Sequence, residues 1–137
     1  GTEMYPFNPS GSYRHLEGWV NHNTAWNVSL AMLNWFDNRP GKVTRKKEAL
    51  EISWEAPVNY DPAVKDVLPL TVYVNDRRVG RVMLREEKNN GLGFTAMVPV
   101  QDNVIVLQGK LAEVKKGDTI RFGYGYGILE KSLTLRF

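Results

Sequence analysis

Short segments in which apolar and polar residues alternate restrict the fold of this chain more than any other feature. In the segment 50–55, Leu50, Ile52 and Trp54 are separated by polar residues. Because successive side chains of a strand point to opposite faces of a sheet, this spacing predicts a strand with one buried face, and Trp54 is expected in the core. Further strands are predicted over 70–74, 79–84, 94–100, 104–107, 120–126 and 133–137.

Residues that favour turns separate the predicted strands. The pairs 75–76 and 102–103 each combine Asn with Asp, which predicts turns, the first within the clearest hairpin of the sequence. The segment 57–69 holds three prolines and is expected to be a long loop, of the kind that is often functional. Pro99 suggests that the strand 94–100 lies at a sheet edge. Roughly eight short strands with such turns favour an all-β fold, an antiparallel two-sheet β-sandwich of the jelly-roll type.

The segment 24–36 has two interpretations. Val28, Leu30 and Met32 alternate with smaller or polar residues, as in a strand, whereas Leu30 and Leu33 also fall at helical spacing. We expect a strand because the rest of the chain is β, with one short helix as the alternative.

Length and composition predict one soluble domain. The chain has 137 residues, 42% of them hydrophobic and 24% charged, which is the usual balance of a globular protein. Two prolines and a glycine make the first dozen residues irregular, so 1–12 is expected to be a linker or leading segment and 13–137 a single domain. The chain has no apolar run of about 18 residues, so no membrane partner is expected. The net charge of +3 is not concentrated in a stripe, so no nucleic-acid partner is expected.

The residue types that carry enzyme chemistry are scarce. There is no cysteine, the two histidines (His15 and His22) lack a motif, and no GxSxG sequence occurs. We therefore expect no catalytic residues, no metal site and no cofactor. A structural calcium ion held by loop carboxylates is a separate alternative. Its candidates by residue type alone are Asp37, Asp61, Asp66 and Asp102.

Aromatic and planar polar residues in two turns are the candidate ligand surface. Aromatic rings can pack on the C–H face of a sugar while amide and guanidinium groups bind its hydroxyls, and such rings lose little entropy on binding. The turn after residue 34 and the long loop each combine these residue types. The candidate ligand-binding residues are Trp35, Asn38, Arg39, Asn59 and Tyr60.

Two further patterns have both an ordinary and a functional interpretation. Arg77 and Arg78 lie beside a turn, where a guanidinium can pair with the carboxylate of a ligand or can simply be solvated. Gly123, Gly125 and Gly127 alternate with tyrosines. Such glycines leave bare backbone on one face of a strand, to be covered by a neighbouring side chain such as a tryptophan or approached by a ligand.

Two segments resemble the accessory β-sandwich modules that are appended to carbohydrate-active enzymes. They are 70–84 (LTVYVNDRRVGRVML) and 114–126 (VKKGDTIRFGYGY). The chain is also similar to the jelly-roll C-terminal module of phage-borne sialate O-acetylesterases. The resemblance implies a non-catalytic, carbohydrate-binding module of a larger secreted or phage-encoded protein, which binds sialylated glycans beside a separate catalytic domain of the same chain.

The alternative function is a protein–protein interaction or oligomerisation module, of the adhesin or phage-fibre type. In that case Tyr124, Tyr126 and Phe137 would be buried in an interface between subunits.

Overall fold

The structure, a computed structural model, describes residues 27–33, 37–58, 60–125 and 127–137. The chain divides into two compact units, residues 1–34 and 35–137. In the first unit, 27–33 is helical, so the strand expected over 24–36 is wrong for these residues and the helical alternative is confirmed. A helix satisfies its backbone groups within the segment, whereas a strand needs a partner strand. The expected linker 1–12 lies outside the described residues.

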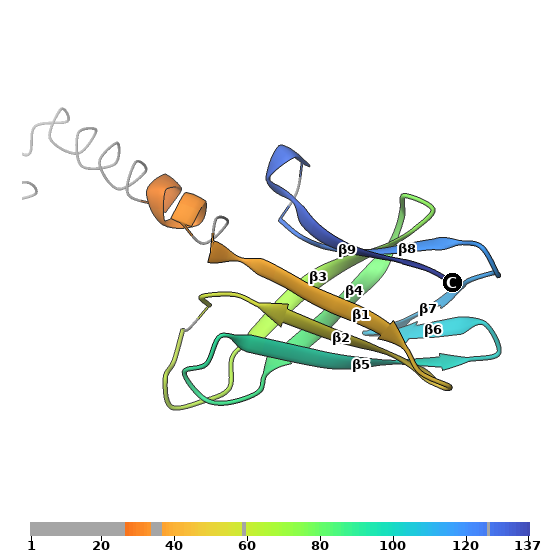
Figure 1. The fold of residues 1–137 in the computed structure, drawn as a ribbon, viewed down its shortest axis with the longest axis horizontal. Coiled ribbons are helices and arrows are strands. Elements are labelled where there is room, and N and C mark those ends of the chain that lie inside the picture. Colours follow the sequence, from red (N-terminus) through yellow and green to blue (C-terminus); the bar gives the residue numbers. More distant parts are fainter. Residues whose placement is uncertain (1–26, 34–36, 59, 126) are drawn as a thin grey trace, which may run out of the picture. The chain divides into compact units, whose positions relative to one another are not determined.

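The described part of the second unit contains nine strands and one turn of 3₁₀ helix (Figure 1). They are β1 (Arg39–Arg45), β2 (Ala49–Glu55), β3 (Val67–Val74), β4 (Arg77–Glu86), β5 (Gly93–Gln101), β6 (Val104–Leu107), β7 (Lys110–Glu113), β8 (Thr119–Tyr124), η1 (Gly127–Leu129) and β9 (Lys131–Arg136). Neighbouring strands pair antiparallel, which confirms the all-β class of this unit. Strands β1 and β7 were not expected from the sequence.

The strands follow one continuous path, β1-β2-β5-β4-β3-β8-β9, with the hairpin β6–β7 attached through β5. The two ends of the path lie side by side. At one end of β1 the Lys131 ammonium donates to the backbone carbonyl of Asn38 at 2.6 Å, and at the other the Arg45 guanidinium lies 3.7 Å from the centre of the Phe137 ring. The sheet is therefore curled nearly into a barrel, and the two-sheet jelly roll is not confirmed.

Apolar side chains of alternate strand positions fill the interior of the barrel. Burying one such side chain stabilises the fold by about 1.5–3 kcal/mol. Trp54 is 1% exposed, as predicted. The other most deeply buried large apolar residues are Phe94, Phe122, Leu50, Ile52, Leu68, Leu70, Leu84, Ile105 and Ile120.

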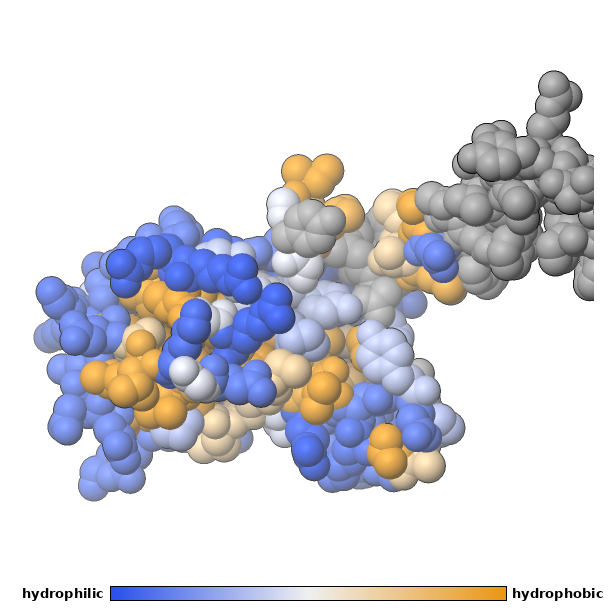
Figure 2. Space-filling view, turned by 180° about the vertical axis from the view of Figure 1, so that it is seen from behind, coloured by the Kyte–Doolittle hydropathy of each residue, from blue (hydrophilic) through white to orange (hydrophobic). Residues whose placement is uncertain are grey.

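The opposite positions of β4 face outward. Arg81, Met83 and Arg85 are exposed, whereas Val82 and Leu84 between them are buried. Figure 2 views the molecule from the side of β3 and β4, where strongly hydrophilic residues gather with apolar ones between them. The exposed side chains of Arg81 and Arg85 make the outer face of β4 basic.

Two predicted hairpin turns are confirmed by their backbone angles. Asn75 and Asp76 have φ of 48° and 62°, and Asp102 and Asn103 have φ of 49° and 61°. Two consecutive left-handed residues make the turn type that matches the twist of the flanking strands, and Asn and Asp tolerate this conformation best after glycine.

Pro99 does not mark an edge strand, because β5 lies between β2 and β4. On the side of β5 that faces β2, the N–H of Val100 donates to the backbone carbonyl of Glu48 at 2.8 Å. Because neighbouring residues of a strand direct their backbone nitrogens to opposite sides, the nitrogen of Pro99 faces away from β2, toward the side of β4. There the pairing with β4 ends at Thr95. The missing N–H of the proline therefore costs no hydrogen bond between strands.

A buried carboxylate ties two loops together. Glu86, 1% exposed, accepts hydrogen bonds from the backbone N–H groups of Asp66 (3.0 Å) and Gly91 (2.5 Å). The Asp66 carboxylate in turn accepts from the N–H of Tyr60 at 2.7 Å. The long loop ends at residue 66, three residues before the predicted end, because β3 begins at Val67.

We expect Glu86→Ala to lower the free energy of unfolding by about 2 kcal/mol or more, because each buried N–H left without an acceptor costs about 1–3 kcal/mol. Glu86→Gln keeps one acceptor oxygen and should lose less. Glu87→Ala removes the exposed neighbouring glutamate and is the matched control, with a change within about 0.5 kcal/mol. Urea denaturation measures all three, and equal stability of Glu86→Ala and Glu87→Ala would contradict the loop tie.

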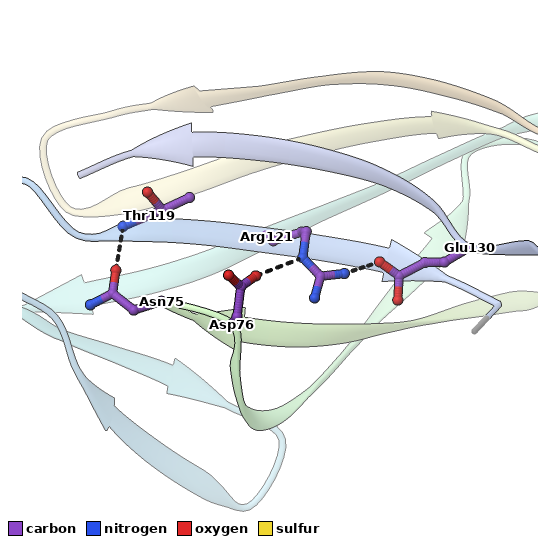
Figure 3. Close-up of polar contacts among 5 residues, drawn as sticks. All are labelled: Asn75, Asp76, Thr119, Arg121 and Glu130. Atoms are coloured by element: carbon purple, nitrogen blue, oxygen red, sulfur yellow. Dashed lines mark hydrogen bonds and ion pairs between the residues drawn. The ribbon is translucent and has the colours of Figure 1, made fainter. Parts of the chain in front are cut away.

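The turn before β8 is joined to the turn after β3. The Asn75 amide donates to one carboxylate oxygen of Asp118 at 2.9 Å, and the N–H of Lys115 donates to the other at 2.8 Å. These hydrogen bonds, that of Asn75 first, hold the pKa of Asp118 below its ordinary value of 3.8. The amide oxygen of Asn75 also accepts from the N–H of Thr119 at 3.0 Å (Figure 3).

This contact should make stability depend on acid pH. Because the pKa of Asp118 is lowered by folding, its stabilisation is complete above the unfolded pKa, about 3.9, and is lost as pH falls through the folded pKa. Asn75→Gly removes the amide without straining the left-handed turn. We expect it to raise the pKa of Asp118, measured by carboxyl ¹³C NMR titration, and to reduce stability at neutral pH more than below about pH 3. A pKa of Asp118 that is unchanged by Asn75→Gly would show that the Asn75 amide does not lower it.

Candidate functional site

The structure describes three of the five residues expected to bind a ligand. Trp35 and Asn59 lie outside the described residues. Arg39 is exposed at the start of β1, and Tyr60 is 83% exposed in the long loop. Asn38 is fully buried.

Asn38 has a structural role. Its side-chain oxygen accepts a hydrogen bond from the indole N–H of Trp54, and its backbone carbonyl accepts from Lys131. Its amide nitrogen is buried and has no hydrogen-bond partner among the described residues. The side chain of Asn38 is therefore not part of the surface that a ligand could reach, because the indole of a core tryptophan takes its oxygen as acceptor.

Arg39 belongs to a row of charged residues that runs from β1 across β2 to the start of β5. It lies opposite Glu55 of β2, which lies opposite Gly93 of β5. The carboxylate of Glu87 occupies the space beside Gly93, where a Cβ would come within 2.9 Å of its oxygen. The row thus places one guanidinium and two carboxylates on the same stretch of surface.

Two hollows adjoin at this row, and we call them together the Arg39 surface. The first, about 350 Å³, is lined by Arg39, Ser53, Glu55 and Glu87 among others. The second, about 280 Å³, shares Arg39 and Glu55 and extends along Asp37, Ala56, Pro57 and Leu92.

A β-bulge at Gly41 shapes the first hollow. The pairing of β1 with β2 shifts by one residue between Pro40 and Lys42, so Gly41 is the extra residue. A Cβ at Gly41 would lie 2.8 Å from the carbonyl oxygen of Ser53. Only glycine lets the two strands approach this closely, and the bulge turns the start of β1, with Arg39, relative to the rest of the strand.

Tyr60 lies near a second tyrosine of the same barrel end. Burial raises the pKa of Tyr124 above its ordinary value of 10.0, and the charge of Tyr60 at high pH acts in the same direction. Tyr124 pairs with Lys131, whose ammonium binds the carbonyl of Asn38, the residue before Arg39. This series of contacts places Tyr60 and Arg39 at the same end of the barrel, although Tyr60 is not among the described residues that line the two hollows.

The glycines near the end of β8 accommodate a glutamate. A Cβ at Gly123 would lie 2.6 Å from the carboxyl carbon of Glu130, so the covering side chain is Glu130 and not a tryptophan. Glu130 pairs with Arg121, which also lies 3.6 Å from a carboxylate oxygen of Asp76 (Figure 3). Gly125 and Gly127 have φ of 85° and 61° and belong to the turn after β8.

A third and larger hollow combines residues that the sequence did not bring together. It measures about 600 Å³ and lies between β4 and the turn of the β6–β7 hairpin. We call it the β4 cleft. Its lining is Arg78, Val79, Gly80, Arg81, Gln108 and Lys110. Of these, sequence reasoning singled out only Arg78, because no local pattern shows that the hairpin packs against β4.

The described residues lack both a metal-ligating cluster and a membrane-spanning helix. Within them, no group of three or more His, Asp or Glu side chains is placed to hold a metal ion. Two of the calcium candidates serve their own loop instead: Asp61 accepts from the N–H of Ala63 at 2.9 Å, and Asp66 accepts from that of Tyr60. In the same part of the chain, no helix has the length and apolar character needed to span a membrane.

Comparison of the chain with family models, curated proteins and solved structures finds no match.

Proposed function

We propose that this chain is a non-catalytic carbohydrate-binding module of a larger secreted or phage-encoded protein, and that it binds a sugar at the Arg39 surface. The observation that carries the proposal is the row formed by Arg39, Glu55 and Glu87 along a hollow of about 350 Å³. Sites for small ligands commonly occupy 300–1,000 Å³ and contain a few convergent polar groups.

The chemistry of the row suits hydroxyl groups. A sugar hydroxyl both donates and accepts a hydrogen bond, so it can donate to Glu55 or Glu87 and accept from the guanidinium of Arg39. Tyr60 supplies a ring that is 83% exposed at the same end of the barrel, on which the C–H face of a sugar can pack.

We favour a neutral sugar over a sialylated one at this surface. Glu55 and Glu87 contribute two negative charges and Arg39 one positive charge, with Asp37 beside them in the second hollow. A sugar carboxylate placed there would face more negative than positive charge, and like charges repel at short distance.

Binding is favoured over hydrolysis because of the exposure of the two glutamates. Glycosidases that use two carboxylates keep one of them protonated in apolar surroundings. Glu55 and Glu87 are both exposed to solvent.

A glycan array of neutral and acidic sugars, followed by titration calorimetry, tests the proposal. We expect a neutral glycan to bind, and Arg39→Ala and Glu55→Gln each to weaken binding about tenfold or more, because a hydrogen bond to a charged group contributes about 1.5–3 kcal/mol. Tyr60→Ala should also weaken binding, because it removes the exposed ring on which the sugar is expected to pack. Arg136→Ala removes an exposed arginine of β9 outside both hollows and should leave affinity unchanged.

Two outcomes have different consequences. Failure of every glycan on the array to bind, neutral or acidic, would refute the function, and binding of acidic glycans alone would refute the preference for a neutral sugar. Binding that is unchanged in all three variants would refute only the site.

A second candidate function, protein–protein interaction or oligomerisation, is favoured by one observation. Ile128 and Leu129 of η1 are 96% and 45% exposed, an unusual position for adjacent apolar residues. Phe137, expected in such an interface, is only 7% exposed and belongs to the core of its own chain.

Light scattering across protein concentrations tests this candidate. If the chain self-associates, we expect a stable oligomer, which Ile128→Ser should convert to monomer because it removes an exposed apolar side chain. A wild-type chain that is monomeric at all concentrations would exclude self-association.

A further inference from the structure

The β4 cleft gathers positive charge in a concave site. Arg78, Arg81 and Lys110 line it together with the carboxamide of Gln108, and none of its described lining residues is acidic. Arg81 and Lys110 are exposed, so their charged groups can reach a ligand in solution.

Two local features of β4 form the cleft. Val72 of β3 pairs with Gly80 and Tyr73 pairs with Arg78, so Val79 is the extra residue of a β-bulge. A bulge bends its strand and re-aims the adjacent side chains. At Gly80, a Cβ would lie 2.8 Å from a methyl carbon of Leu107, so glycine lets the β6–β7 hairpin come close to β4.

The cations of the cleft are not neutralised by the described part of the chain. The ion pairs among the described residues lie elsewhere: they join Lys46 to Glu51, and Arg121 to both Asp76 and Glu130. Arg121 on β8 differs from the arginines of the cleft, because its guanidinium is paired with the carboxylates of Asp76 and Glu130 (Figure 3). Arg78, Arg81 and Lys110 have no such partner among the described residues, and a bound anion would relieve their mutual repulsion.

We propose that the β4 cleft binds an anionic polysaccharide through its sulfate or carboxylate groups. A guanidinium binds either group with two parallel hydrogen bonds, and Gln108 offers a donor and an acceptor to a neighbouring hydroxyl. Arg85 extends the basic surface beyond the cleft: it lies four residues after Arg81 on the same face of β4, about 13 Å away at 3.3 Å per residue. This spacing suits a long polyanion better than a single small ion.

A polysaccharide fits the cleft better than a nucleic acid. Proteins that bind single-stranded nucleic acids combine positive charge with aromatic rings on which bases stack. None of the described residues that line the cleft is aromatic. Tyr73, on the neighbouring strand, has the guanidinium of Arg121 3.9 Å from its ring centre. The β4 cleft shares no lining residue with the Arg39 surface, so this inference does not rest on the proposed function.

Fluorescence anisotropy of the full chain with labelled heparin, polygalacturonate and oligothymidylate tests the inference. Heparin carries sulfates and polygalacturonate only carboxylates, so these two probes distinguish the sources of the anion. We expect at least one of the two to bind at low salt, with an affinity that falls as salt rises. Arg81→Gln and Lys110→Gln should each weaken binding about tenfold, and the double variant more.

The matched control is Lys47→Gln, which removes one exposed lysine from the turn between β1 and β2. It should change the affinity less than about twofold, because Lys47 is not among the residues that line the cleft and exposed charges outside a binding site contribute little to affinity. Arg81 and Lys110 lie on different elements, so one variant remains informative if the other fails to fold, and thermal unfolding identifies such a failure. Neutral glycan binding at the Arg39 surface should be unchanged in both.

Three results would overturn the inference. They are no binding of either polysaccharide at low salt, an equal loss of affinity in Lys47→Gln and the cleft variants, and tighter binding of oligothymidylate than of heparin. The last would assign the cleft to nucleic acid instead.

Discussion

The hydrogen bonds accepted by Asn38 hold together the point at which the barrel closes. β1 and β9 end the strand path, and the backbone carbonyl of Asn38 receives the Lys131 ammonium of β9. Its side chain receives the indole N–H of Trp54, the largest buried side chain of the core. One residue thus connects the barrel edge to the barrel interior. Since Arg39 follows directly, the position of the Arg39 surface depends on this junction.

The sequence predicts the elements whose signals are local. Alternating apolar residues identify most strands, because burial on one side of a sheet imposes that period. Strand β1 escapes prediction because its side chains are exposed or half-buried along its whole length and it contains Pro40 and Gly41, which are typical of turns. The helix over 27–33 is predicted only as the alternative, because Val28, Leu30 and Met32 also alternate as in a strand while Leu30 and Leu33 fall at helical spacing. Closure into a near-barrel depends on contacts between β1 and β9, far apart in sequence.

The candidate sites follow the same division. The exposure of Tyr60 can be inferred from its proline-rich loop, and that of Arg39 from its place beside a turn. The burial of Asn38 cannot be inferred from the local sequence, because it depends on a hydrogen bond with Trp54, sixteen residues away. The β4 cleft cannot be inferred either, because Arg81 and Lys110 come together only when the β6–β7 hairpin folds back against β4.

The hydrogen bonds that Glu86 accepts from the two loops affect how a ligand could bind at the loop end of the barrel. Fixing the backbone of one loop residue costs about 1–2 kcal/mol in conformational entropy. When a flexible loop becomes ordered on binding, this cost reduces the free energy of binding. In this protein Asp66 and Glu86 order the backbone around Tyr60 when the chain folds. If a sugar binds here as we propose, a weak ligand with few contacts would suffice, but the surface would adapt poorly to a ligand of another shape. The selectivity of the proposed site would then be set when the chain folds and not when the ligand binds.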